Sequence, residues 1–125
     1  MKIEFTIPYP PDKRGRAAWS KRFSLNAIYA GKHWSKRLED KEFWHWLVRS
    51  ELQKQKVPCK RFERPVRITF LHNCGLDIDN CSYEEKMIVD SLIGPVLIQD
   101  DRRYYTERVS KYHDGDGTRV MVEEI

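Results

Sequence analysis

The stretch from residue 66 to residue 101 limits the possible folds of this chain more than any other part of it. It begins with residues 66–70, where Val, Ile and Phe alternate with polar residues, a pattern that predicts a buried strand. Asp-Ile-Asp-Asn follows at residues 77–80, and Gly94-Pro95 predicts the end of the helix that comes after it. A strand, an acidic turn and a helix are therefore expected in immediate succession.

Asp77 and Asp79 are candidate metal ligands. Residues two apart on an extended chain point to the same side, so both carboxylates can direct oxygens at one point. Charges so close repel each other unless a cation or a proton lies between them, and hard oxygen ligands favour Mg²⁺, Mn²⁺ or Ca²⁺. An EF-hand is excluded, because Ser82 and Ile88 stand where its Gly and Glu are required. A turn in which an Asp side chain caps its own backbone is the alternative.

The helix predicted to begin near residue 80, with Asn80 or Asp79 as its N-cap, has one polar and one apolar face. At about 100° per residue the polar face holds Asp79, Tyr83, Lys86 and Asp90, and the apolar face holds Cys81, Ile88, Val89 and Leu92. A carboxylate and a lysine on one face suit a site that handles phosphate. The alternative is a surface ion pair between Lys86 and Asp90, four residues apart.

Four pieces of this sequence follow one another in order, namely Asp-Ile-Asp-Asn at 77–80, Lys86, Asp-Ser-Leu at 90–92 and Asp-Asp at 100–101. Together they resemble the core of the RusA-type Holliday junction resolvases, small homodimeric, Mg²⁺-dependent endonucleases of phages and prophages. Ile-Pro-Tyr-Pro-Pro at 7–11 also resembles the first strand and Pro-Pro turn of that family. The resemblance spans nearly the whole chain.

The resemblance implies a crossover junction endodeoxyribonuclease, which resolves four-way branched DNA in recombination and repair by paired hydrolysis of phosphodiester bonds. Asp77, Asp79 and Asp101 would be catalytic metal ligands for Mg²⁺, or Mn²⁺, with Asp100 as the alternative to Asp101, and no small-molecule cofactor is expected. Lys86 would neutralise charge on the phosphoryl oxygens. It stands three residues later than in the family pattern, almost one helical turn, which leaves its catalytic role open.

Other functions fit the same residues. The chain could be a phage-type DNA-binding protein without catalysis, or a less structure-specific flap or nicking nuclease. A protein-binding module that uses the aromatic helix described below is a further alternative. A requirement for Mg²⁺ separates the first of these from the nuclease.

Charge is unevenly distributed along the 125 residues. Residues 1–73 carry 17 Lys and Arg against 7 Asp and Glu, whereas residues 74–125 carry 6 against 12. A basic half attracts polyanions and an acidic half holds cations, which is typical of a nuclease. The basic residues expected to contact DNA are Lys13, Arg14, Arg16, Lys21, Arg22, Lys32, Arg102 and Arg103. Residues 12–33 are equally well explained as a basic surface loop whose aromatic side chains pack into the core.

The expected fold is a single α+β domain of residues 1–125, with a small mixed sheet of about four strands and two helices on one face. Strands are predicted at 2–8, 66–70, 102–112 and 118–123, with 113–117 as the hairpin turn between the last two. A main helix is predicted from about residue 35 to 55, with Trp44, Leu47, Val48 and Leu52 facing the sheet. Its surplus aromatic surface, Trp46 above all, suggests a dimer interface.

The sequence argues against several classes of protein. It lacks the run of about 20 apolar residues that a membrane span requires, and residues 1–7 do not resemble a signal peptide. Cys59, Cys74 and Cys81 are odd in number and lack Cys-x-x-Cys spacing, which argues against a disulfide framework and a structural zinc site. Free thiols in a cytoplasmic protein without a membrane partner are therefore expected.

Overall fold

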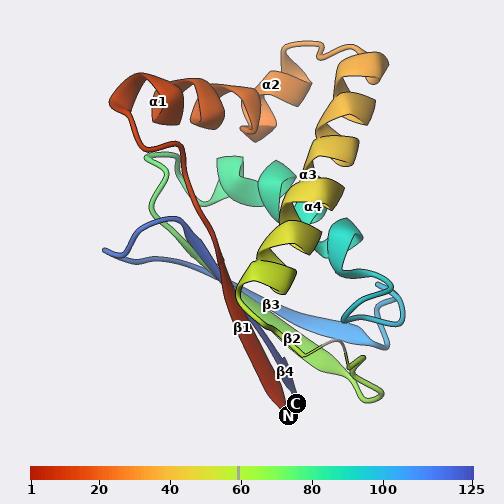
Figure 1. Cartoon of the computed structure of the whole chain (residues 1–125). Helices are drawn as coiled ribbons and strands as arrows, with labels where there is room; N and C mark the ends of the chain where they lie inside the picture. The colour runs from red at the N-terminus through yellow and green to blue at the C-terminus, as the bar shows by residue number, and fades with distance from the viewer. Residues whose placement is uncertain (59) are drawn as a thin grey trace.

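The computed structural model describes residues 1–58 and 60–125 and has an α+β architecture (Figure 1). Within these ranges the elements are β1 (Lys2–Ile7), α1 (Lys13–Arg22), α2 (Leu25–Tyr29), α3 (Trp34–Lys54), β2 (Val66–His72), η1 (Asp79–Cys81), α4 (Ser82–Leu92), β3 (Tyr105–Tyr112) and β4 (Thr118–Glu124). The predicted α+β class and the four-stranded mixed sheet are confirmed. The free thiols predicted at Cys74 and Cys81 are confirmed as well, whereas Cys59 lies outside the described residues.

The strands of the sheet are arranged in the order β1-β4-β2-β3. β4 pairs antiparallel with both β1 and β2, and β2 pairs in parallel with β3 through the crossover that contains α4. The predicted hairpin between the last two strands is therefore wrong, because β2 lies between them. The physical reason is burial: Val120 and Val122 of β4 are fully buried and need neighbours on both sides, whereas the polar β3 suits the edge of the sheet.

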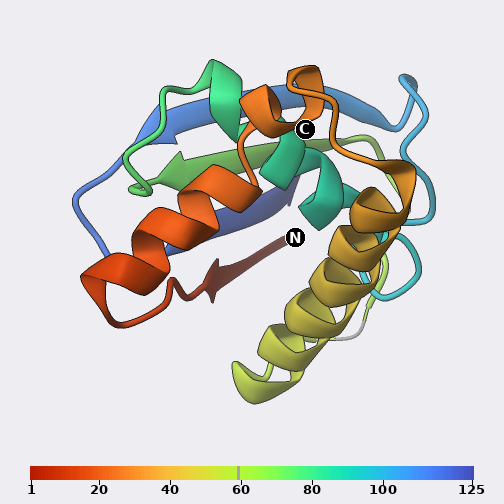
Figure 2. The same ribbon diagram turned by 90° about the horizontal axis from the view of Figure 1, so that it is seen from above.

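The helices lie on one face of the sheet (Figure 2). The core forms between that face and the helices α3 and α4, and the predicted stripe of Trp44, Leu47, Val48 and Leu52 is buried in it. The expected two helices were too few, since the structure has four within its described residues. Residues 12–33, for which the sequence suggested a basic surface loop, contain the helices α1 and α2.

Helix α1 forms without the apolar periodicity that usually reveals a helix. Its N-cap is Asp12, whose side chain accepts a hydrogen bond from the backbone N–H of Gly15 at 3.1 Å. In the described range 13–22 no residue is fully buried, and the helix is held at its C-terminal end instead. There Trp19 packs at 4.9 Å, ring centre to ring centre, on the buried ring of Phe23.

The carboxylate of Asp40 joins α1, α3 and α4. Asp40 belongs to α3, is 1% exposed, and accepts hydrogen bonds from Arg22 Nε at 2.9 Å and from the Tyr83 hydroxyl at 2.6 Å. Lys32, from the connection between α2 and α3, forms an ion pair with the Asp40 oxygen that also accepts from Tyr83. Since a buried carboxylate is costly unless it is paired and hydrogen-bonded, these partners allow Asp40 to lie inside the fold.

Replacing Asp40 by Asn should therefore lower the free energy of unfolding by about 3 kcal/mol, because the largely buried Lys32 ammonium loses its anion. Urea titration followed by circular dichroism measures the change. Glu39→Gln is the matched control on the same helix, since Glu39 forms only an exposed pair with Lys36 at 3.5 Å and should cost less than about 0.5 kcal/mol. Equal effects of the two substitutions would contradict this role of Asp40.

Candidate functional site

A cleft of about 210 Å³ between α4 and β3 brings together two of the residues that the sequence singled out. It is lined by Ser82, Glu85, Lys86, Val89, Asp100, Tyr105 and Arg108. Lys86 Nζ donates to Asp90 Oδ1 at 3.0 Å and lies 3.7 Å from Asp100 Oδ2. The hydrogen bond that Lys86 donates to Asp90, together with the negative charges of Asp90 and Asp100, raises the pKa of Lys86. The helix and the loop before β3 are thereby joined by one ammonium group.

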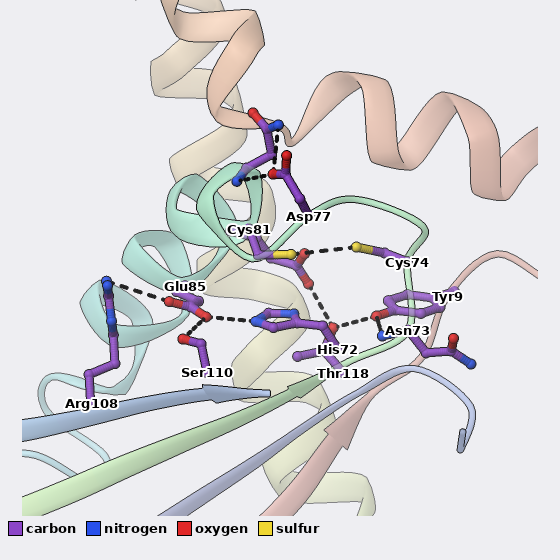
Figure 3. Close-up of polar contacts among 12 residues, drawn as sticks. Tyr9, His72, Asn73, Cys74, Asp77, Cys81, Glu85, Arg108, Ser110 and Thr118 are labelled. Atoms are coloured by element: carbon purple, nitrogen blue, oxygen red, sulfur yellow. Dashed lines mark hydrogen bonds and ion pairs between the residues drawn. The ribbon is translucent and has the colours of Figure 1, made fainter. Parts of the chain in front are cut away.

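Asp77 forms the capping turn that was the alternative to a metal ligand. Its Oδ1 accepts from the backbone N–H of Asn80 at 3.0 Å and from the Asn80 side-chain amide at 2.9 Å, as Figure 3 shows. The Asn80 side-chain oxygen accepts in turn from the backbone N–H of Asn26 at 3.2 Å, which ties the turn to α2. The predicted cap by Asp79 or Asn80 is therefore wrong, because the helical segment begins earlier, with η1. Asp79 is exposed on that turn.

Asp100 and Asp101 have different surroundings. Asp100 lines the cleft beside Lys86, whereas Asp101 Oδ1 accepts from the backbone N–H of Arg103 at 2.6 Å. The Asp101 carbonyl also accepts from the backbone N–H groups of the next two tyrosines, so Asp101 organises the turn that leads into β3. This turn occupies residues 102–104, and the strand predicted from residue 102 begins only at Tyr105.

The predicted metal ligands do not form a closed site. Within residues 1–58 and 60–125, no group of three or more His, Cys, Asp or Glu side chains is placed to hold a metal ion. The oxygen chemistry of Asp77, Asp79 and Asp101 suits Mg²⁺, which often takes one or two carboxylates and completes its shell with water and phosphate. Their arrangement, however, does not fit a preformed three-carboxylate centre.

A buried polar network lies behind the cleft (Figure 3). Glu85 Oε2 is 2.6 Å from His72 Nε2 and accepts from the Ser110 hydroxyl at 2.7 Å, while Glu85 Oε1 lies 3.5 Å from Arg108 Nη1. Burial lowers the pKa of His72, but the hydrogen bond to Glu85 and the charges of both neighbouring glutamates outweigh it, and the net pKa is raised. Glu85 therefore links the buried imidazole of His72 to Arg108, whose side chain lines the cleft.

A second branch of the network runs from α4 to the ends of three strands. Glu84 Oε1 accepts from the Thr118 hydroxyl at 3.0 Å, and the Thr118 hydroxyl is 2.7 Å from the Tyr9 hydroxyl. Tyr9 accepts in turn from the backbone N–H of Asn73 at 3.1 Å. Burial raises the pKa of Glu84 to about 7, although the charge of His72 opposes the rise.

Sequence reasoning missed His72, Glu84 and Glu85. The available signal was the position of His72, which continues the buried face of Val66, Ile68 and Phe70 in steps of two. The two glutamates gave no comparable signal, because adjacent acids on a helix are usually exposed to solvent. Both are at most 2% exposed here.

The predicted DNA-binding residues divide into two groups. Arg22 and Lys32 are engaged with the buried carboxylate of Asp40, although the Arg22 side chain is 45% exposed. The remaining six are exposed, namely Lys13, Arg14, Arg16 and Lys21 on α1, and Arg102 and Arg103 on the turn before β3. The aromatic residues of this segment divide too, since Phe23 is buried and Tyr29 is 79% exposed.

Helix α1 places positive charge beside residues 75–80, which carry Asp77 and Asp79 and are called the acidic loop below. Lys13 and Arg16 line a cavity of about 350 Å³ together with Cys74 and Gly75. The Ser20 hydroxyl donates to the Cys74 carbonyl at 2.7 Å, which fixes the helix against the loop. The basic segment and the acidic motif are therefore neighbours in space.

An apolar groove of about 570 Å³ adjoins the charged cleft. It lies between α2, α3 and α4 and shares Ser82 and Lys86 with the cleft. Trp34 and Leu38 of α3 line it and remain largely exposed. Further along the same helix Trp46 is 63% exposed, so the predicted surplus of aromatic surface is confirmed.

Comparison of the chain with protein-family models and with curated proteins finds no match. None of the helices in the described residues is both long and apolar enough to cross a membrane. A functional conclusion therefore has to be drawn from the cleft, the network behind it and the basic helix.

The raised pKa of Glu84 predicts a stability that falls as the pH rises. The unfolded carboxyl ionises around its ordinary pKa of 4.5 and the folded one around 7, so the folded state binds more protons between these values. Glu84→Gln stays neutral and should remove the contribution of this carboxyl to the decline, which is up to about 3 kcal/mol between pH 5 and pH 8. Part of the decline should remain, because the raised pKa of His72 acts in the same direction.

Urea unfolding of both proteins across that pH range measures the difference. Glu107→Gln serves as the control, because Glu107 is a half-exposed acid on β3 that pairs with Arg67. An unchanged pH dependence in Glu84→Gln would show that the Glu84 carboxyl is ionised in the folded protein.

Proposed function

We propose that this chain is an endodeoxyribonuclease that hydrolyses phosphodiester bonds in branched DNA, as its resemblance to the RusA-type Holliday junction resolvases implies. The observation that carries the proposal is the meeting of Lys86 and Asp100 in one cleft. They belong to separate pieces of the motif on which the resemblance rests. Arg108, from β3, adds a second cation to the same cleft.

The cleft has the groups needed to hold a phosphate. The side chains of Lys86 and Arg108 are 61% and 53% exposed, so both cations can reach a bound strand. Charge-assisted hydrogen bonds from an ammonium and a guanidinium would bind the phosphate oxygens and stabilise charge that develops on them. Glu85, held by His72 and Ser110, is a positioning residue for Arg108.

Mg²⁺ belongs to this proposal through the resemblance. Asp77, Asp79 and Asp101 are the residues that the resemblance assigns to it, and Asp100 is the one that lies in the cleft. Because the described residues do not gather three such carboxylates, no catalytic step is assigned to the ion.

The basic face of α1 suits the DNA arms. Lys13, Arg14 and Lys21 are exposed there, and contacts from such residues to backbone phosphates fix the position of a protein on DNA without reading its sequence. A homodimer completes the proposal, because a two-fold axis presents two equivalent sites to the two strands of a four-way junction.

A second candidate function is DNA binding without cleavage. The observation in its favour is the absence, among the described residues, of three acidic side chains placed for a metal ion. It shares the basic helix with the nuclease but requires no divalent ion.

A nicking assay on a synthetic four-way junction, with Mg²⁺ or with EDTA, separates the two functions. The nuclease should cut only with Mg²⁺, and Asp79→Asn and Asp100→Asn should each reduce the rate at least about 100-fold, because each loses a carboxylate that the chemistry needs. Junction affinity in a gel-shift assay should stay the same or increase, since a negative charge is removed.

Asp114→Asn is the matched control, because Asp114 is exposed in the turn before β4, outside the cleft. It should cut at the unsubstituted rate. Binding without any cutting in Mg²⁺ would favour the second function, and full cutting by Asp79→Asn would refute the assignment of that residue.

Replacing Trp46 by Ala should weaken a homodimer at least about tenfold if α3 forms its interface, because exposed tryptophans contribute strongly to protein interfaces. Sedimentation equilibrium measures the dissociation constant. Tyr112→Ala removes another largely exposed aromatic side chain, on β3, and should leave the constant unchanged. A chain that is monomeric at all concentrations would rule out the dimer.

A further inference from the structure

Cys74 and Cys81 lie side by side beneath the acidic loop. Their Sγ atoms are 3.7 Å apart, and one thiol donates a weak hydrogen bond to the other (Figure 3). Cys74 follows β2, and Cys81 ends η1 at the start of α4. The segment between them, residues 75–80, carries Asp77 and Asp79.

The two thiols have different environments. Cys74 is half-buried and lines the cavity of about 350 Å³ that Lys13 and Arg16 also line, whereas Cys81 is fully buried. The hydrogen bond from Cys81 lowers the pKa of Cys74. A partly exposed thiol near positive charge is the one that a small oxidant reaches and that reacts as a thiolate.

The loop has room to bring the sulfurs together. A disulfide requires an S–S distance of about 2.05 Å, so the two atoms must approach by roughly a further 1.7 Å. Gly75, next to Cys74, has a φ of +83°, and apart from its two chain neighbours no residue has a heavy atom within 4 Å of the position that its side chain would occupy. Because Cys81 is fully buried and Ser20 holds the Cys74 carbonyl, the movement falls to the Cys74 side chain and to the open loop at Gly75.

We propose that Cys74 and Cys81 are a site of reversible oxidation, at which a peroxide closes a disulfide across residues 75–80. The Cys74 thiolate attacks one peroxide oxygen, the O–O bond breaks, and a sulfenic acid forms on Cys74 while hydroxide leaves. The Cys81 sulfur then attacks the Cys74 sulfur, the S–O bond breaks and water leaves. With hydrogen peroxide as the oxidant, the net change oxidises two thiols to one disulfide and reduces one hydrogen peroxide to two waters.

The disulfide would act on the acidic loop. It fixes the distance between the two ends of residues 75–80 and so restricts the positions that Asp77 and Asp79 can take. A consequence that rests on the proposed function is that oxidation slows junction cleavage and a thiol reductant restores it. The test below detects the disulfide itself and does not measure cleavage, so its result does not depend on whether the chain is a nuclease.

The experiment treats the folded full-length chain with hydrogen peroxide, blocks remaining thiols with an alkylating reagent, and maps the peptides by mass spectrometry. A peptide pair joined through Cys74 and Cys81 is expected, two hydrogen atoms lighter than the reduced pair and separated again by a reductant. Cys59→Ser should give the same pair. In the chain unfolded with guanidinium, disulfides should form among all three cysteines. That result would show that the folded structure selects the Cys74–Cys81 pair.

Two variants isolate the mechanism. Cys81→Ser should accumulate a sulfenic acid on Cys74 that a dimedone-type probe captures, whereas Cys74→Ser should form no intramolecular disulfide in the folded protein. Circular dichroism confirms that each variant is folded, and Cys81→Ala replaces Cys81→Ser if the buried hydroxyl prevents folding. Oxidation of Cys74 only to sulfenic or sulfinic acid in the unsubstituted chain, without the crosslink, would overturn the proposal.

Discussion

The buried carboxylate of Asp40 is the interaction on which the arrangement of the helices depends. Helix α1 has no fully buried residue, so it is held in place by a few contacts at its C-terminal end, of which the ion pair between Arg22 and Asp40 is one. Arg22 approaches Asp40 from the C-terminal end of α1, Lys32 from the connection after α2, and Tyr83 from α4. Because leaving such a charge unpaired inside the protein is costly, the three helices and their connection have one favourable arrangement. Arg22 and Lys32 thereby stabilise the fold, and the other basic side chains of α1 remain exposed and can contact a polyanion.

The same principle operates on the other side of α4. Glu84 and Glu85 are buried side by side against the sheet, where Thr118 hydrogen-bonds to one oxygen of Glu84, and His72 and Ser110 to one oxygen of Glu85. These partners come from three different strands, so one helical turn fixes the ends of β2, β3 and β4 relative to one another. A buried polar network of this kind tolerates little displacement, because each lost partner leaves a desolvated group. The acidic loop and the cleft therefore adjoin a part of the fold that this network makes rigid.

The sequence allowed the local parts of this structure to be predicted and left the non-local parts open. The stripe from Trp44 to Leu52 and the alternation in β2 reflect periods that the backbone itself imposes. Strand order could not be obtained in this way, because the turn before β4 indicates a reversal of the chain without indicating which strand it pairs with. In the site, Lys86 and Asp100 were singled out by type and order, but their proximity depends on the loop after α4. Glu85 was missed because its burial depends on His72, a partner on another element.

The turn at Asp77 decides how a divalent ion could enter this loop. The Asp77 oxygen that accepts two hydrogen bonds from Asn80 is the atom that a metal would otherwise use, so ion and turn compete for it unless the ion takes the second oxygen. Each hydrogen bond contributes about 1 kcal/mol, and the contact from Asn80 to Asn26 would be disturbed with them. Under the nuclease proposal, a DNA phosphate would add oxygens to such a shell, because Mg²⁺ in proteins is often bound by one or two carboxylates together with substrate phosphate. It follows that metal binding and DNA binding would be mutually dependent here, with the loop between Cys74 and Cys81 as the element that has to adjust.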